Sequence, residues 1–331
     1  MDLFELTRKL ISIPSLSGKE NKLADFLCGY FHSIGLPYEE QIIKGNRRNL
    51  WVFPSKNQKI ILCTHLDTVS PFIPPSEDPD YIYGRGACDA KGIMASMIQA
   101  VCGLRGEGLS GFGLLLTAGE EADSDGAKKA CESGKHSRYI VVGEPTGNRM
   151  GKSHWGFLSL KLTAKGKAAH SAFPNRGDSA VLKLMESLNL LRSWYEETGG
   201  KDEFLMNIAL IEGGTAPNII PGRAESTVTF RTRISPRILL EKIKNVILPD
   251  IETDVKNQSE PQNLFTLPGF KQAVLTYGTD IPYLKNFGKP LLFGPGSGED
   301  AHTEKEKIKK QDLADSVSYY KKIIKLLMNM K

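Results

Sequence analysis

Short apolar runs that lead into polar turns constrain the fold of this chain more than any other feature. The runs lie at 49–53, 59–63, 112–116 and 139–142, and a helical pattern at 91–104 separates the second run from the third. Strands that alternate with helices predict an α/β fold, a sheet with parallel members and helices on its faces. Ligands bind such sheets at the carboxyl ends of the strands, so the polar turns mark a candidate site.

Three of the runs lead directly into turns with acidic or imidazole side chains. The residues are His65 and Asp67, then Glu120 and Glu121, then Glu144. His65 and Asp67 are two residues apart on an extended segment, so their side chains point the same way and one can orient the other. Adjacent buried carboxylates such as Glu120 and Glu121 are costly without a counter-charge, which a metal ion supplies.

Two further candidates lie outside these turns. Asp89 sits in a glycine-flanked turn that lets the backbone approach an ion, although an Asx turn or a helix cap would explain it as well. His302 follows the glycine-rich segment 294–298. The 5 cysteines show no C-x-x-C spacing, which argues for reduced thiols and against a cysteine-based zinc site. Any metal must therefore be held by imidazoles and carboxylates.

A charge count groups these residues. Three carboxylates carry −3, two divalent ions carry +4, and a bridging hydroxide brings the sum to zero, so Glu120 is left outside the coordination sphere as the general base. Imidazole and carboxylate ligands favour two Zn²⁺ ions, with Co²⁺ or Mn²⁺ as alternatives. The predicted metal ligands are His65, Asp89, Glu121, Glu144 and His302.

The character of the chain changes after Met150. The patterns predict a strand at 155–162, a helix at 178–195, strands at 204–211 and 224–233, and a helix at 236–247. These form a small α+β unit with one covered sheet face. We expect it to be an insert at 154–262 in a catalytic domain made of residues 1–153 and 263–331, which ends in a helix at 311–328. Near the N-terminus, Ser17 and Glu20 fit a capping box ahead of an amphipathic helix.

The motifs, taken in order, resemble those of a known enzyme family. They are LISIPSLSGKE, THLDTV, YGRGACDAKG, TAGEEADSDGAKK, VVGEPT, GKAAHSAFPNRGDSA and GGTAPNIIPGRAE, followed by a late histidine. The series is similar to the co-catalytic metallohydrolases that include acetylornithine deacetylase, succinyl-diaminopimelate desuccinylase, aminoacylase and carboxypeptidase G. The resemblance covers nearly the whole chain. It implies a zinc-peptidase-like domain, a mixed sheet with helices on both faces, and an inserted lid that also forms a dimer.

The resemblance also implies how the ligands divide. His65 and Glu144 would hold one ion, Glu121 and His302 the other, and Asp89 would bridge both, with a cis peptide bond following Asp89.

The remaining roles likewise follow from the resemblance alone. Asp67 would orient His65, and Glu120 would be the general base. His170 would reach across a dimer interface to the scissile carbonyl as an oxyanion donor. The substrate-binding positions would be Asn218, Arg231, Gly278 and Thr279.

Glu144 bears on the substrate. Deacylases and carboxypeptidase-like members of the family have Glu at this position, whereas its di- and tripeptide aminopeptidases generally have Asp. The residue therefore favours attack of a metal hydroxide on an N-acyl amino acid, and the segment 294–303 most resembles acetylornithine deacetylase. Glu299 and Asp300 could receive a cationic substrate side chain, or they could simply be solvent-exposed. A succinyl-diaminopimelate desuccinylase and a di- or carboxypeptidase are the alternatives. A non-catalytic metal-binding module is a further one, which the intact Glu120 argues against.

Other functional classes have little support. The net charge of +5 comes partly from lysines in the C-terminal tail, without the aromatic and arginine interleaving of a nucleic-acid surface. The segment 147–153 is one residue too short for a phosphate loop. Asp2 and Glu5 stand where a signal peptide would be basic, and no apolar run is long enough to span a membrane. We expect a cytoplasmic homodimer that acts on a small N-acyl amino acid or dipeptide and binds neither nucleic acid nor membrane.

Overall fold

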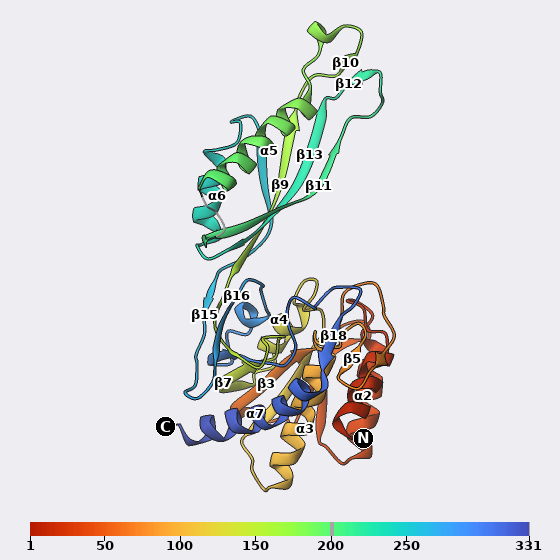
Figure 1. The fold of residues 1–331 in the computed structure, drawn as a ribbon, viewed down its shortest axis with the longest axis vertical. Helices are drawn as coiled ribbons and strands as arrows, with labels where there is room; N and C mark the ends of the chain where they lie inside the picture. Colours follow the sequence, from red (N-terminus) through yellow and green to blue (C-terminus); the bar gives the residue numbers. More distant parts are fainter. Residues whose placement is uncertain (199–201, 331) are drawn as a thin grey trace. The chain divides into compact units, whose positions relative to one another are not determined.

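The computed structural model describes residues 1–198 and 202–330, which form two compact units (Figure 1). The larger unit comprises Met1–Lys152, Leu264–Val274 and Thr279–Lys331, and the smaller comprises Ser153–Asn263 and Leu275–Gly278. Residues 275–278, which the sequence placed in the catalytic domain, join the smaller unit, and the Trp155 N–H there donates to the Leu275 carbonyl at 2.9 Å. Within the described ranges, no helix combines the length and apolarity needed to cross a membrane.

A mixed sheet forms the centre of the larger unit. Its strands are, in spatial order, β1 (Tyr38–Lys44), β2 (Arg47–Val52), β6 (Phe112–Thr117), β3 (Asn57–His65), β7 (His136–Val142) and β17 (Lys289–Leu292). Strand β3 runs parallel to β6 and β7, and β17 runs parallel to β7, while β2 is antiparallel to its neighbours. The carboxyl ends of β6, β3, β7 and β17 therefore meet at one edge of the sheet.

Helices cover both faces of this sheet, which confirms the predicted fold class (Figure 1). The helices are α1 (Leu3–Ser12), α2 (Asn21–Ser33), α3 (Lys91–Gly106), α4 (Asp125–Cys131) and α7 (Lys310–Asn329). All except α4 bury side chains in one core with Leu62 and Leu114. Helix α4 packs on the opposite face, where the Asn49 amide donates to the Gly126 carbonyl at 2.8 Å. A sheet buried on both faces needs continuous apolar strands, which is the pattern seen at 112–116 and 139–142.

The predicted capping box ahead of α2 is wrong. Glu20 is the N-cap residue of that helix and makes no side-chain cap hydrogen bond. Its carboxylate instead accepts the Gly18 N–H at 2.9 Å and pairs with Arg47 at 3.2 Å. The Ser17 hydroxyl donates to Asp67 at 2.7 Å. Both side chains thus serve tertiary partners distant in sequence, which a local pattern cannot show.

Short elements complete the larger unit and lead into the smaller one. Two three-stranded sheets consist of β4 (Ser76–Glu77), β5 (Tyr81–Tyr83) and β18 (Lys307–Lys309), and of β8 (Met150–His154), β15 (Gln262–Asn263) and β16 (Gln272–Leu275). A 3-10 turn spans Ile281–Tyr283. Lys307 of β18 lies opposite Tyr83 of β5, so the chain that follows His302 runs beside the segment that leads to Asp89.

The smaller unit is an antiparallel sheet with helices on one face (Figure 1). Its strands are, in spatial order, β11 (Phe204–Gly213), β13 (Arg223–Thr232), β9 (Gly156–Lys165) and β14 (Glu252–Ser259), and its helices are α5 (Ala180–Glu197) and α6 (Pro236–Lys244). Leu158, Leu160 and Leu162 of β9 face the helices in one core. Beyond the sheet, β10 (Ala169–His170) pairs with β12 (Ile219–Ile220), and a 3-10 turn spans Pro174–Arg176.

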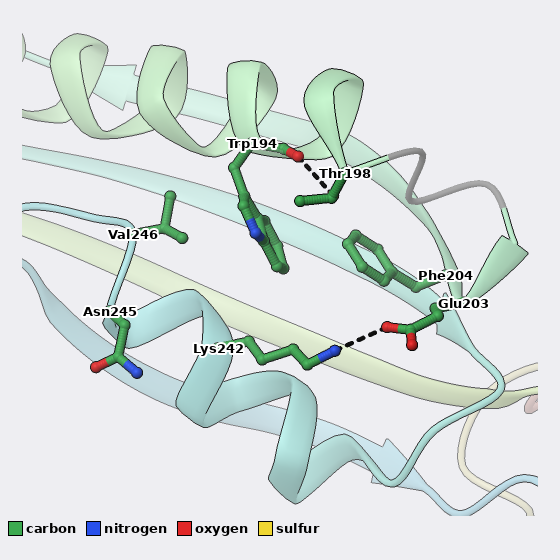
Figure 2. A pocket seen from close by; sticks show the side chains of 7 residues that line it. All are labelled: Trp194, Thr198, Glu203, Phe204, Lys242, Asn245 and Val246. Carbon is green, nitrogen blue, oxygen red and sulfur yellow. Dashed lines mark hydrogen bonds and ion pairs between the residues drawn. The ribbon is translucent and has the colours of Figure 1, made fainter.

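A pocket of about 340 Å³ lies within the smaller unit between α5 and α6 (Figure 2). Its lining residues are Trp194, Thr198, Glu203, Phe204, Lys242, Asn245 and Val246. The Trp194 and Phe204 rings stack at 5.0 Å, and Lys242 pairs with Glu203 at 2.8 Å. No residue with a predicted role lines this pocket.

Candidate metal centre

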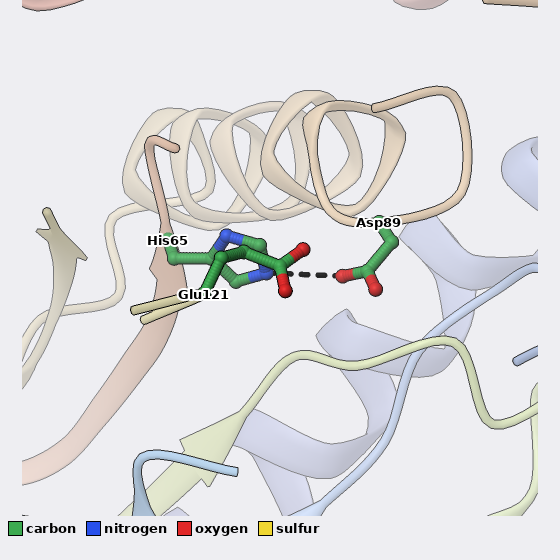
Figure 3. Close-up of side chains that lie close together, drawn as sticks. All are labelled: His65, Asp89 and Glu121. Carbon is green, nitrogen blue, oxygen red and sulfur yellow. Dashed lines mark hydrogen bonds and ion pairs between the residues drawn. The ribbon is translucent and has the colours of Figure 1, made fainter. Parts of the chain in front are cut away.

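Three of the predicted ligands converge at the carboxyl edge of the larger sheet (Figure 3). His65 is the last residue of β3, Glu121 follows β6, and Asp89 precedes α3. One ligand atom from each lies within 4.8 Å of the others. The His65 Nε2 atom is 3.0 Å from Asp89 Oδ1. Parallel pairing of β3 with β6 thus brings His65 and Glu121 together, and the turn before α3 adds Asp89.

His302 adds a second imidazole to this group. Its Nε2 atom lies 2.8 Å from Glu121 Oε1 and 3.4 Å from Asp89 Oδ2. The two oxygens of Asp89 therefore face two different imidazoles, His65 on one side and His302 on the other. That geometry suits a carboxylate shared between two cations. His302 has a φ of 64°, a left-handed conformation that costs about 1–3 kcal/mol for a non-glycine residue.

Glu144, at the end of β7, supplies the observation that tests whether a cation fits. It is buried, and its Oε1 atom has no hydrogen-bond partner among the described residues. Burial, together with the charges of Glu120 and Asp89, raises the pKa of Glu144 well above its ordinary value. An orphaned carboxylate oxygen beside other acids is stabilised by a cation. Imidazole and carboxylate donors suit zinc, cobalt or manganese, so these residues fit divalent metal ions.

Hydrogen bonds between the two histidines and the acids shift the pKa values of this group. Burial alone would raise the pKa of Asp89, but hydrogen bonds to His302 and His65 outweigh it and lower that pKa. The same contacts with Asp89 and Glu121 raise the pKa of His302 to about 10. The acids therefore already attract positive charge to both imidazoles, which is the charge that metal ions would provide.

Asp67 contacts His65 through its backbone. The His65 Nδ1 atom lies 2.9 Å from the Asp67 carbonyl oxygen and 3.7 Å from Asp67 Oδ1. Because a carbonyl oxygen only accepts, Nδ1 carries a proton, and Nε2, which faces Asp89, is the nitrogen that would bind a metal. The Asp67 carboxylate instead accepts three backbone N–H groups of residues 119–121, at 2.9, 3.1 and 3.1 Å. It thus holds the turn that carries Glu120 and Glu121.

Glu120 is half-buried beside these ligands. Burial raises its pKa well above the ordinary range, and the negative charges of Asp280, Glu121 and Asp89 add to the effect. A carboxylate with a raised pKa is a stronger base, which suits proton transfer near neutral pH.

The sequence reasoning missed Asp280. It is buried and accepts a hydrogen bond from the Thr117 hydroxyl at 3.2 Å, while burial raises its pKa to about 6. Its position directly after the predicted Gly278 and Thr279 was the available signal. Thr279 lies in the larger unit, where its hydroxyl accepts the Ile281 N–H at 3.1 Å. The peptide bond Asp89-Ala90 is cis, as predicted.

The other predicted residues belong to the smaller unit, at two separate places. His170 pairs with Ile219 in the β10–β12 ribbon, and the Ser171 N–H donates to the Asn218 carbonyl at 2.9 Å. Arg231 lies near the end of β13, with its guanidinium 4.7 Å from the centre of the Phe157 ring. A side chain added at Gly278 would meet Arg231 at 3.4 Å. The roles of His170, Asn218, Arg231, Gly278 and Thr279 stay predictions, as do those of Glu299 and Asp300.

Known proteins are similar to this chain in sequence. Residues 61–326 match the family model described as Peptidase family M20/M25/M40. A protein of Schizosaccharomyces pombe that contains a peptidase M20 domain is 35% identical over 340 residues, covering 98% of this chain and 84% of that protein. A probable carboxypeptidase of Talaromyces marneffei is 32% identical over 386 residues, covering 97% and 85%.

A solved structure extends the likeness to the fold. A tripeptidase from Staphylococcus aureus superposes with a TM-score of 0.83 at 20% sequence identity, covering 99% of this chain and 98% of that one.

Proposed function

Because the chain belongs to peptidase family M20/M25/M40, it is a hydrolase of amide bonds, and we propose that its substrate is an N-acyl amino acid. The observation that carries the hydrolytic mechanism is the position of Asp89 between two imidazoles, with the charge of Asp89 acting on Glu120. This arrangement separates residues that hold cations from one residue that moves a proton.

Five side chains would hold two divalent ions, zinc in the first instance and cobalt or manganese as alternatives. His65 and Glu144 would bind one ion, Glu121 and His302 the other, and Asp89 both. Bound there, the ions would supply Lewis-acid chemistry, which polarises a scissile carbonyl and lowers the pKa of a water molecule.

Proton transfer falls to Glu120. Its carboxylate takes a proton from the attacking water and delivers it to the nitrogen of the leaving amino acid as the C–N bond breaks. The Asp67 carboxylate fixes the backbone of the turn on which Glu120 stands, so the base does not have to be positioned at each turnover. The Nδ1–H of His65 stays on the Asp67 carbonyl throughout.

The geometry of the smaller unit favours a homodimer. His170 pairs with Ile219 of β12, which precedes β13. Strand β13 begins at Arg223, and Arg231 lies eight residues further along it. At about 3.3 Å per residue, His170 and Arg231 are roughly 25 Å or more apart. A small substrate cannot contact both within one chain. If both residues act, a second copy supplies one of them.

The surface of the smaller unit offers a place for that second copy. Strand β11 is an edge of the sheet, and Leu210 and Ile211 on it are 60% and 62% exposed. Leu182 and Met185 on α5, which packs beside β11, are 66% and 52% exposed. We call these four residues the edge patch. A strand with one open edge, flanked by apolar side chains, is suited to a two-fold contact with its own copy.

Two features of the sequence bear on the identity of the acyl group. Glu144 is the glutamate found in deacylases and carboxypeptidase-like members, and the segment 294–303 resembles acetylornithine deacetylase. N-acetylornithine is therefore the first substrate to test, with succinyl-diaminopimelate as an alternative. A carboxypeptidase is the second candidate, and it is favoured by the relative in Talaromyces marneffei. In both cases the leaving amino acid carries a free carboxylate.

A hydrolysis panel tests the proposal. The purified protein would be supplied with Zn²⁺, Co²⁺ or Mn²⁺ and assayed on N-acetylornithine, N-acetyllysine, succinyl-diaminopimelate and dipeptides. We expect the N-acetyl amino acids to be cleaved with the highest kcat/KM. Faster cleavage of dipeptides would replace the deacylase with the carboxypeptidase. No hydrolysis of any substrate, together with metal binding, would favour a non-catalytic binding module.

A further inference from the structure

Glu306 occupies an unusual position next to the metal centre. It is buried, and its Oε1 atom accepts backbone N–H groups of Gly86, Cys88 and Asp89 at 3.0, 3.2 and 3.2 Å. Its Oε2 atom accepts from the Arg85 guanidinium at 2.7 Å. The Cys88 Sγ atom also lies 3.6 Å from Oε1, so one carboxylate accepts from five donors in a single stretch of five residues, 85–89.

The backbone of Glu306 joins the same stretch. Its carbonyl accepts the Gly84 N–H at 3.0 Å, and the next residue, Lys307, pairs with Tyr83. Glu306 also lies only four residues after His302. It thus connects the two loops that carry Asp89 and His302, neither of which lies in a strand of the main sheet.

The remaining ligands are anchored differently. His65 is the last residue of β3 and pairs with Thr117 of β6. Glu144 lies two residues after the end of β7, and the Gly143 N–H before it donates to the Cys63 carbonyl at 2.8 Å, so the sheet anchors both ligands. Asp89 and His302 lack that support, and the left-handed backbone of His302 needs surroundings that hold it in place.

Stability alone does not account for the Arg85–Glu306 pair. Burying two charges costs desolvation that their attraction only roughly offsets, and an apolar pair often serves as well. Three backbone donors aimed at one oxygen form a fixed geometry that an apolar pair could not provide.

We propose that Glu306 is a positioning residue that holds Asp89 and His302 at the spacing at which both reach the same metal ion. It would act mainly on the ion between Glu121 and His302, and much less on the ion between His65 and Glu144. This inference rests on the two-ion site proposed above.

The test measures, by calorimetry, the binding of Zn²⁺ as it is titrated into the metal-free protein. The parent is expected to bind two ions. Glu306→Gln removes the charge and leaves an amide facing Arg85. We expect it to bind the first ion with little change in affinity and the second at least tenfold more weakly, the range seen when groups that orient metal ligands are replaced. Glu304→Gln makes the same chemical change at an exposed position two residues away, and should bind both ions as the parent does.

If Glu306 served folding alone, Glu306→Gln would lower the thermal midpoint of the metal-free protein, and both metal affinities of the folded protein would stay at parent values. That result would overturn the proposal. Equal weakening of both ions would also overturn it. If Glu306→Gln does not fold, the double variant Arg85→Met/Glu306→Gln removes the unpaired buried charge and is judged by the same two affinities; its failure to fold would assign Glu306 to folding instead. A parent that binds fewer than two ions would refute the two-ion site itself.

Discussion

The carboxylate of Asp67 accepts the backbone N–H of Glu120 at 3.1 Å, and the same carboxylate holds the residues on either side of Glu120. Asp67→Asn should therefore reduce kcat by about a hundredfold, because an amide cannot accept all three N–H groups and the base loses its fixed position. KM should change little. Ser17→Ala removes one hydroxyl donor from the same carboxylate but leaves the three backbone contacts, so its kcat should stay near that of the parent. Steady-state kinetics distinguish the two, and similar kcat losses in both would contradict the expectation.

Substitutions of the adjacent residues Glu120 and Glu121 should have different effects. Glu120→Gln should lower kcat by about 10² to 10⁴, the usual contribution of a general base, with the bound metal unchanged. Glu121→Gln should lose metal, because this carboxylate lies 2.8 Å from the His302 imidazole. Metal analysis after gel filtration, alongside kcat, separates the outcomes. Loss of metal from the Glu120 variant would make that residue a ligand.

Ionisation of the buried Asp280 carboxyl should lower the stability of the metal-free protein as the pH rises. Its pKa is raised from 3.8 to about 6, so between these values the folded state holds a proton that the unfolded state has released. Asp280→Asn lacks this titration. From pH 4 to pH 8 the variant should therefore gain up to roughly 3 kcal/mol relative to the parent, at about 1.36 kcal/mol per pKa unit. Urea unfolding at several pH values measures the difference. A difference independent of pH would mean that the carboxyl ionises normally.

Mixing two inactive variants tests whether His170 acts on a second copy. His170→Ala and Glu120→Gln should each have little activity. A heterodimer of the two would contain one site with Glu120 intact and His170 supplied by the other chain. After subunit exchange at equal concentrations, half of the dimers would be mixed with one active site in two, so about a quarter of parent activity should return. Absence of any recovery, with exchange verified by mass spectrometry, would argue that His170 acts within its own chain.

We expect the edge patch to form the dimer interface. Ile211→Asp places a charge on the exposed edge of β11 and should shift the protein toward the monomer. Ile238→Asp is the control, because Ile238 on α6 is 54% exposed and lies outside the patch. Sedimentation velocity measures both. A dimer that survives the first change would place the interface elsewhere.

The elements that carry the ligands could be predicted because their signals are local. The apolar runs at 112–116 and 139–142 lie within β6 and β7, and the polar turns after them hold Glu121 and Glu144. Parallel pairing then brings those turns to one edge.

Residues that depend on distant partners escaped prediction. Glu306 binds residues about 220 positions earlier in the chain, and Asp280 binds Thr117, 163 positions earlier. Ser17 and Glu20 fitted a local cap, but tertiary contacts with Asp67 and Arg47 prevailed. No local spacing records such contacts, since they form only after the sheet has placed its strands.

The order of the elements along the chain determines which parts of the site can form first during translation. Strand β17 joins the sheet beside β7, and His302 follows it, yet both are translated only after the whole segment Ser153–Asn263. A nascent chain on the ribosome can pair β3, β6 and β7 and gather His65, Asp89, Glu121 and Glu144 well before the second imidazole exists. With His302 as a ligand, as proposed above, the metal centre would be completed late in synthesis, and hydrolysis would have to wait until residue 302 has left the ribosome.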